Sequence, residues 1–390
     1  MSGTTESRAG VGPIRRWRDI GPRRRFGLIL LVGAASAFGT LRLVDWWTSW
    51  PSRAVLWTKG DHYPLAFSAD GTILATRRAE SEQIVLWDPK DGRERATWAE
   101  VKGGFNFSGA FSPDGRTYAS PWFSRRSGKN FSVKLIEVAT GRIRASVASP
   151  HGGFLGLRFR DGGATLRLLA ADPKARTAVD VEVATGRVVA SRPISETSRM
   201  NFLGSSALSE DGSLLAMAGP TASGPSMSLV VWDVDRDREA FSLPGTSGGP
   251  MPTRVAFSPD GKALAVGLDD GSIALWDLAT RRLRWSVKAH SRGWDSVNLA
   301  FSPEGKTLAS TGRFGKLVLS FDLVRVVLAQ VFSDPDRAEP VELILLDQAD
   351  GRRLRSSKRD GIAVFSPDGR TLATSHDDGS VRLRDIPTPP

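Results

Sequence analysis

One short pattern recurs seven times along the chain and constrains its fold more than any other feature. Each copy has an alternating apolar stretch, a turn of the form Ser-Pro-Asp-Gly and a second short apolar stretch, as in AFSPDGKALAVG from residue 256 to 267. Spacings of 44 to 64 residues are too long for leucine-rich or ankyrin units, so each copy begins a larger β unit. The acidic residue of the turn is Asp70, Asp114, Asp161, Asp211, Asp260, Glu304 or Asp368.

Every copy continues with a further strand that ends on Trp-Asp or a variant of it, 17 to 23 residues after the acidic residue of the turn. The Pro and Gly of the first turn favour a hairpin, and a second turn after the Trp-Asp pair leads into a fourth strand. Four antiparallel strands in each unit are typical of a propeller blade. The pairs that end the third strands are predicted to be Trp87-Asp88, Ile136-Glu137, Val181-Glu182, Trp232-Asp233, Trp276-Asp277, Phe321-Asp322 and Arg384-Asp385.

From about Arg53 to Ile386 the chain resembles WD-repeat β-propellers, with degenerate repeats of the bacterial type. The resemblance implies an all-β fold of seven four-stranded antiparallel blades in a closed ring, here occupying residues 53–390. The last repeat stops after its third strand, VRLRDI at 381–386, and RAVLWT at 53–58 precedes the first repeat. We therefore predict that this N-terminal strand completes the last blade and closes the ring.

The sixth repeat is irregular. LVLSFDLVRVVLAQVF (317–332) and VELILLDQADGRRL (341–354) both have the pattern of a third and a fourth strand. We assign the first segment to the blade and the second to an inserted hairpin, with a partial eighth blade as the alternative.

The resemblance also implies a hydrogen-bonded network inside each blade, made by a His, a Ser or Thr, an Asp and the Trp. His62, His151 and His290 occupy the His position, but none of their blades shows the full set. For example, Val181 and Phe321 replace the Trp. We expect the blades to depend more on apolar packing than on this network.

The N-terminal region is predicted to anchor the chain in a membrane. Residues 1–25 carry seven Arg against two acidic residues, and residues 26–44 are apolar except for Arg42. Those 19 residues form a helix of about 28 Å, enough to span a bilayer. The basic flank favours a cytoplasmic N-terminus and an extracytoplasmic propeller. Residues 45–52, with Trp46, Trp47 and Trp50, are predicted to be an aromatic juxtamembrane linker.

A second interpretation of this region is an export signal. Arg23-Arg24-Arg25-Phe26 resembles a twin-arginine motif, and Ala35-Ser36-Ala37 resembles a cleavage site. Cleavage there would release a soluble exported propeller. An uncleaved signal anchor is the favoured interpretation, because cleavage would leave a short apolar region.

Composition excludes several classes of function. The chain has no Cys, which excludes disulfides, thiolate metal sites and Cys nucleophiles. Of the net charge of +11, the first 25 residues carry +5, and the excess of +6 over the other 365 residues is scattered, so no nucleic-acid partner is predicted. There are four His, three of them at the structural position, and no phosphate loop, so we predict no metal, no cofactor and no catalytic site.

What remains is recognition of protein partners by loops that do not repeat. The predicted protein-binding residues are Trp122, Phe123, Arg125 and Arg126, with Arg292 and Trp294 in a second loop. Exposed Trp and Arg side chains often anchor interfaces. The favoured function is therefore a non-catalytic, membrane-anchored interaction scaffold. The alternative is an exported propeller that binds a small molecule, or acts as an enzyme, through its central channel.

Overall fold

The computed structural model describes residues 50, 52–56, 61–81, 83–98, 109–123, 131–151, 153–171, 175–195, 206–220, 227–243, 249–290, 298–313 and 341–386. These ranges belong to a compact unit that runs from Trp50 to Pro390. The predicted tail (1–25) and membrane segment (26–44) lie outside the described residues. In the ranges given above, no helix is long and apolar enough to cross a membrane.

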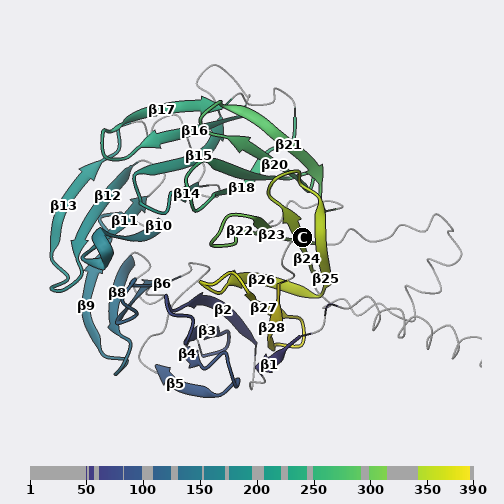
Figure 1. Ribbon diagram of the computed structural model, residues 1–390. Coiled ribbons are helices and arrows are strands. Elements are labelled where there is room, and N and C mark those ends of the chain that lie inside the picture. The colour runs from purple at the N-terminus through teal and green to yellow at the C-terminus, as the bar shows by residue number, and fades with distance from the viewer. Residues whose placement is uncertain are drawn as a thin grey trace, which may run out of the picture. The chain divides into compact units, whose positions relative to one another are not determined.

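Within the described residues, twenty-eight strands form seven antiparallel sheets of four, as predicted (Figure 1). Blade 1 has β2 (His62–Phe67), β3 (Leu74–Arg78), β4 (Ile84–Trp87) and β5 (Glu94–Trp98). Blade 2 has β6 (Ala110–Phe111), β7 (Thr117–Phe123), β8 (Phe131–Glu137) and β9 (Ile143–Ala148). Blade 3 has β10 (Gly153–Arg160), β11 (Thr165–Ala171), β12 (Arg176–Glu182) and β13 (Val188–Pro193). Blade 4 has β14 (Ser206–Leu208), β15 (Leu214–Pro220), β16 (Met227–Asp233) and β17 (Arg238–Leu243).

The remaining blades follow the same order. Blade 5 has β18 (Pro252–Phe257), β19 (Ala263–Leu268), β20 (Ser272–Asp277) and β21 (Arg282–Lys288). Blade 6 has β22 (Asn298–Phe301), β23 (Thr307–Arg313), β24 (Val341–Asp347) and β25 (Arg353–Lys358). Blade 7 has β26 (Asp360–Phe365), β27 (Thr371–His376), β28 (Val381–Asp385) and the N-terminal β1 (Ala54–Leu56).

A serine and an aspartate stabilise the turn between the first and second strands. In five blades the Ser hydroxyl donates to the Asp carboxylate at 2.5–2.6 Å and accepts the backbone N–H five residues further on at 2.9 Å. The Gly that follows has a φ of +66° to +71°, which Gly adopts without strain. The recurring motif is therefore a local device for making a hairpin, as the sequence predicted. Its five Ser-Asp pairs are Ser68-Asp70, Ser112-Asp114, Ser209-Asp211, Ser258-Asp260 and Ser366-Asp368.

The turn between the third and fourth strands has a second constant feature. The residue four places after the strand-ending acid has a positive φ in six blades. Gly92, Gly141, Gly186 and Gly351 supply it in four, and their N–H donates to the acid's own carbonyl at 2.8–2.9 Å. In the other two blades the residues are Asp237, with a φ of +47°, and Arg281, with a φ of +57°.

Blade 6 corrects one prediction. Its third and fourth strands are β24 and β25, so residues 341–354 are part of the blade and not an inserted hairpin or an eighth blade. The predicted third strand ending at Phe321-Asp322 lies outside the described residues. The turn after the third strand explains why residues 341–354 form the blade. This turn has a positive φ four places after the acidic residue, and Gly351 supplies it after Asp347. At the same distance from Asp322 stands Val326, whose β-branched side chain disfavours that conformation.

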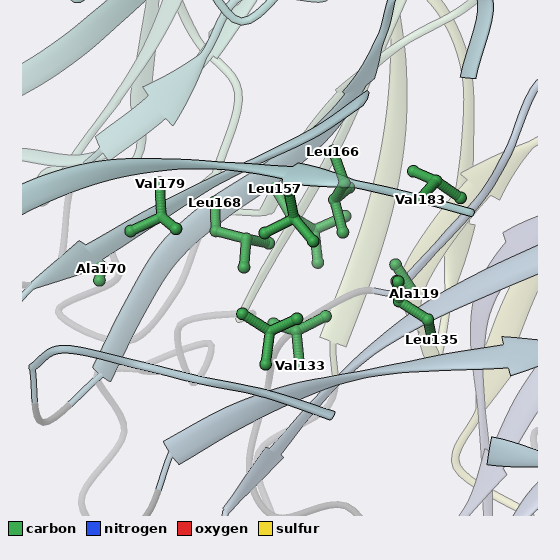
Figure 2. Close-up of a cluster of buried hydrophobic side chains, with 11 residues drawn as sticks. Ala119, Val133, Leu135, Leu157, Leu166, Leu168, Ala170, Val179 and Val183 are labelled. Carbon is green, nitrogen blue, oxygen red and sulfur yellow. The ribbon is translucent and has the colours of Figure 1, made fainter. Parts of the chain in front are cut away.

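Each pair of neighbouring blades shares one buried apolar cluster, and seven such clusters complete the ring in the described part of the chain. Figure 2 shows the cluster between blades 2 and 3, where Leu166 and Leu168 of β11 lie across from Val133 and Leu135 of β8. Burying such side chains provides about 1.5–3 kcal/mol each. Blade contacts, and not the sheets alone, therefore hold the ring together.

The N-terminal strand closes the ring as predicted. In Figure 1 the purple β1 lies beside the yellow β28, and Ala54, Val55 and Leu56 pair with Leu383, Arg382 and Val381. The Trp50 side chain, which we expected in an interfacial aromatic belt, is instead buried between blades 6 and 7 and is 5% exposed. Its indole packs like a core residue because it reaches the apolar cluster that those two blades share.

Blade 3 departs from the others at one buried pair. Six blades place an Ala of the second strand opposite a Leu or Val of the third, for example Ala265 opposite Leu275. Blade 3 has Arg167 opposite Asp180 at the same register. Arg167 is 0% exposed and donates to both Asp180 oxygens at 2.7 and 2.8 Å. It also pairs at 2.8 Å with Asp235, from the second turn of blade 4.

We expect the protein to tolerate replacement of both members of this ion pair by apolar residues, but not the loss of one member alone. Arg167→Ala leaves the Asp180 carboxylate buried with only a distant Arg192, 3.9 Å away, and should cost about 3–5 kcal/mol of unfolding free energy. The double variant Arg167→Ala/Asp180→Leu restores the pair found in the other blades and should recover most of that loss. Urea unfolding followed by circular dichroism measures both, and a double variant as unstable as the single one would contradict the prediction.

Candidate protein-interaction surface

The predicted binding residue Trp122 lies near the end of β7, in the hairpin that β7 forms with β8. Its backbone pairs with Ser132, and the Lys134 ammonium lies 4.5 Å from the centre of its ring. The side chain is half-buried, so one part of the indole packs on the blade while another reaches solvent. A cation over an indole face orients the ring and adds roughly 0.5–1 kcal/mol at an exposed position. Phe123 is the last residue of β7 and pairs with Phe131.

The other predicted binding residues lie outside the described residues. Arg125 and Arg126 belong to the segment that joins β7 to β8, and Arg292 and Trp294 to the segment between His290 and Asn298. The first segment is carried by blade 2, whereas the second joins blade 5 to blade 6, three blades away around the ring in either direction. The strands that carry the two loops are therefore not neighbours, and each loop is a separate candidate surface.

The histidines join strands of the blades. In blade 1 the His62 Nδ1 lies 3.0 Å from the Thr76 hydroxyl, which also accepts the Trp87 indole N–H at 2.8 Å. Arg78, the last residue of β3, donates to the His62 Nε2 at 3.2 Å. Three of the four network members are therefore joined in this blade.

In two further blades the histidine contacts a hydroxyl, which belongs to the second strand in blade 6 and to the third strand in blade 3. His290 lies 2.8 Å from the Ser310 hydroxyl of β23, and His151 lies 2.7 Å from the Thr177 hydroxyl of β12. Neither blade has a Trp at the end of its third strand, where Val181 and Leu346 stand instead. These hydroxyl contacts hold adjacent segments together whether or not the network is complete.

Burial determines the protonation of two of these histidines. It lowers the pKa of His62 to about 4, with the nearby Arg78 acting in the same direction. Burial likewise lowers the pKa of His290 to about 4, helped by Arg353. Both imidazoles are therefore neutral at pH 7. Within the described ranges, no group of three His, Asp or Glu side chains is arranged to hold a metal ion.

The opposite end of the sheets has a cavity of about 620 Å³ at the seam of the ring. It lies between the first turns of blades 1 and 7, and Arg53 and Lys90 supply its cationic side chains. The carboxylates in it are already used by the turns, since Asp70 and Asp368 accept from Ser68 and Ser366. Those hydroxyl bonds hold the pKa of both carboxyls below the ordinary value. The lining residues are Arg53, Phe67, Ala69, Asp70, Gly71, Pro89, Lys90, Ser366, Pro367, Asp368 and Thr371.

The buried histidines predict how stability depends on pH. Between pH 6.5 and 4 the unfolded chain binds a proton at each of these His, whereas the native chain does not, so stability falls as the pH drops through this window. We expect a loss of about 1–2 kcal/mol per histidine by pH 4.5. Thermal melts at pH 7.5 and 4.5 measure it.

The matched variants are His62→Asn and His290→Gln, which keep a nitrogen near the bonded position but do not titrate. Their melting temperatures should change less between the two pH values than that of the wild type. Subtracting the change in the variant from the change in the wild type removes the contribution of the other titrating groups. An equal change in wild type and variants would contradict the assignment.

Comparisons with known proteins agree with this architecture. The family model of the WD domain, G-beta repeat, matches residues 238–277 and 356–385. No curated protein matches the chain. The crystal structure of the β-propeller domain of Cps50 (Swd1) from Myceliophteria thermophila is similar, with a TM-score of 0.57 and 15% identity, covering 87% of this chain and 100% of that one. At this identity the likeness concerns the fold alone, a β-propeller, and the WD-repeat match is confined to the two segments of the family model.

Proposed function

We propose that the protein is a non-catalytic scaffold that binds protein partners through the β7–β8 hairpin end of blade 2. The observation that carries the proposal is the half-buried Trp122 held under Lys134 on a closed ring. A rigid ring presents its loops in fixed positions, so little order has to be gained on binding. Propellers with WD repeats typically act as interaction scaffolds, which supports the same function.

The chemistry of this surface favours an acidic partner. Trp122 and Lys134 stand next to a segment with Arg125 and Arg126, so aromatic area and positive charge occur together. Trp and Arg are the residue types most enriched at the energetic centres of interfaces. A partner that places carboxylates and an apolar group here would gain both kinds of contact.

Cross-linking in native cells, followed by mass spectrometry, tests the scaffold proposal. The variant Trp122→Ala/Lys134→Ala should lose at least one partner that the wild type captures, because it removes the aromatic anchor and its cation. The matched control is Phe241→Ala/Arg281→Ala, which removes a second cation–aromatic pair, at 5.2 Å, on a different part of the ring. Unchanged capture by the first variant, with both variants folded, would rule out this surface.

We further propose that residues 26–44 hold the propeller at the extracytoplasmic side of a membrane. The support is in the sequence: an apolar run of 19 residues after a basic flank. The chain has no Cys, so a single introduced thiol can report its side of the membrane without background.

Two single-Cys variants test the anchor and its orientation. Ser191→Cys lies on exposed β13, and Ser7→Cys lies in the basic tail. A membrane-impermeant maleimide should label Ser191→Cys in intact cells and Ser7→Cys only after lysis. The full chain should resist alkaline carbonate extraction, whereas a chain lacking residues 26–44 should be extracted. The reverse labelling pattern would contradict the orientation, and extraction of the full chain would contradict the anchor.

A further inference from the structure

The last blade has replaced two members of the His-Thr-Trp network by an ion pair. Asp360 begins β26 as His62 begins β2, and Arg384 pairs with Leu372 as Trp87 pairs with Leu74. The Thr374 hydroxyl lies 3.3 Å from the Asp360 carboxylate, and the two residues are separated by the same 14 positions as His62 and Thr76. A buried salt bridge therefore stands where blade 1 has an imidazole and an indole.

This pair is among the most buried charges in the described part of the chain. Asp360 is 0% exposed and Arg384 is 2% exposed, and the Arg384 Nη2 lies 2.6 Å from the Asp360 carboxylate. Arg167 in blade 3 pairs with two carboxylates, which raise its pKa despite its burial. Arg384 pairs with one, and burial lowers its pKa. Nη1, the other terminal nitrogen of Arg384, therefore needs a different acceptor.

That acceptor is the N-terminal segment. The Arg384 Nη1 donates to the backbone carbonyl of Trp50, and the guanidinium carbon lies 5.6 Å from the centre of the Trp50 ring. The Trp50 indole N–H donates in turn to the Asp385 carbonyl at 3.2 Å. Trp50 thus contacts the end of β28 through its carbonyl, its ring and its N–H.

The same segment contacts three consecutive blades. The Trp50 ring packs in the cluster of blades 6 and 7, and Leu56, 0% exposed, packs in the cluster of blades 7 and 1. Between them Arg53 pairs with Asp385 at 3.3 Å and donates to the Pro89 carbonyl of blade 1 at 3.4 Å. The β1 ladder itself is only three residues long.

We propose that blade 7 contains a specific binding site for an extended segment that starts with tryptophan, and that residues 50–56 of the same chain occupy it. Arg384, held in place by Asp360, donates to the carbonyl of Trp50, and the space between blades 6 and 7 accepts its indole. Closure of the ring then depends on this recognition and not on the short β1 ladder alone. The alternative is that Arg384 is only a degenerate replacement of the repeat Trp.

Amide hydrogen exchange on the full chain, read by mass spectrometry, separates these alternatives. Arg384→Met and Trp50→Ala should each speed exchange in the peptide covering residues 50–56 at least tenfold, with blades 3 and 4 unchanged. The matched control is Arg167→Met, which removes another fully buried, Asp-paired arginine. It should speed exchange in β11 and β12 and leave residues 50–56 protected.

The decisive variant is Asp360→His/Arg384→Trp, which gives blade 7 the network of blade 1. Under the proposal, β26 and β27 stay protected while residues 50–56 exchange at least tenfold faster, since the anchor for the Trp50 carbonyl is gone. Wild-type protection of residues 50–56 in this variant would overturn the proposal. Where Trp50→Ala does not fold, Trp50→Phe keeps the apolar bulk and loses only the indole N–H, and unchanged exchange in both Trp50→Phe and Arg384→Met would also overturn it.

Discussion

The hydrogen-bonding edge of β28 has to be covered, and the rest of the structure depends on how this is done. An uncovered edge in a propeller exposes backbone groups and also opens an inter-blade core, because each blade packs on two neighbours. Ala54–Leu56 cover this edge. They form the first strand in the sequence, yet they pair with β28, the last strand in the sequence. Each of the other six sheets is built from four strands that follow one another in the chain, whereas the seam joins the first strand of the described residues to the last.

The features that could be predicted from sequence are the local ones. The Ser-Asp hydrogen bonds and the positive φ of the glycine after them lie within six residues of one another, so the motif itself determines the hairpin. Seven repeated hairpins implied seven blades, and the missing strand after residues 381–386 implied that residues 53–58 supply it. Each inference required only the pattern along the chain, which is why the order of the blades and the closing strand were confirmed.

The features that could not be predicted depend on neighbours in space. Asp180 and Arg167 become partners through register, and Asp235 reaches them from another blade. The sequence suited Trp50 to a membrane interface as well as to the core between blades 6 and 7. A Trp beside an apolar segment fits either environment, and only the folded structure distinguishes them. The error in blade 6 had a different origin, because a local signal was present. Gly351, four places after Asp347, marks the turn between the third and fourth strands, and the pattern of apolar residues does not include it.

The two buried Arg-Asp pairs, in blades 3 and 7, distinguish these blades from the others, which are similar to one another. Six equivalent Ala-Leu or Ala-Val pairs do not distinguish one blade from another, but each buried arginine also uses an acceptor from outside its own Arg-Asp pair. Arg167 requires Asp235 of the following blade, and Arg384 requires a carbonyl from the N-terminal segment. The two pairs thus fix blade 3 against blade 4 and blade 7 against residue 50.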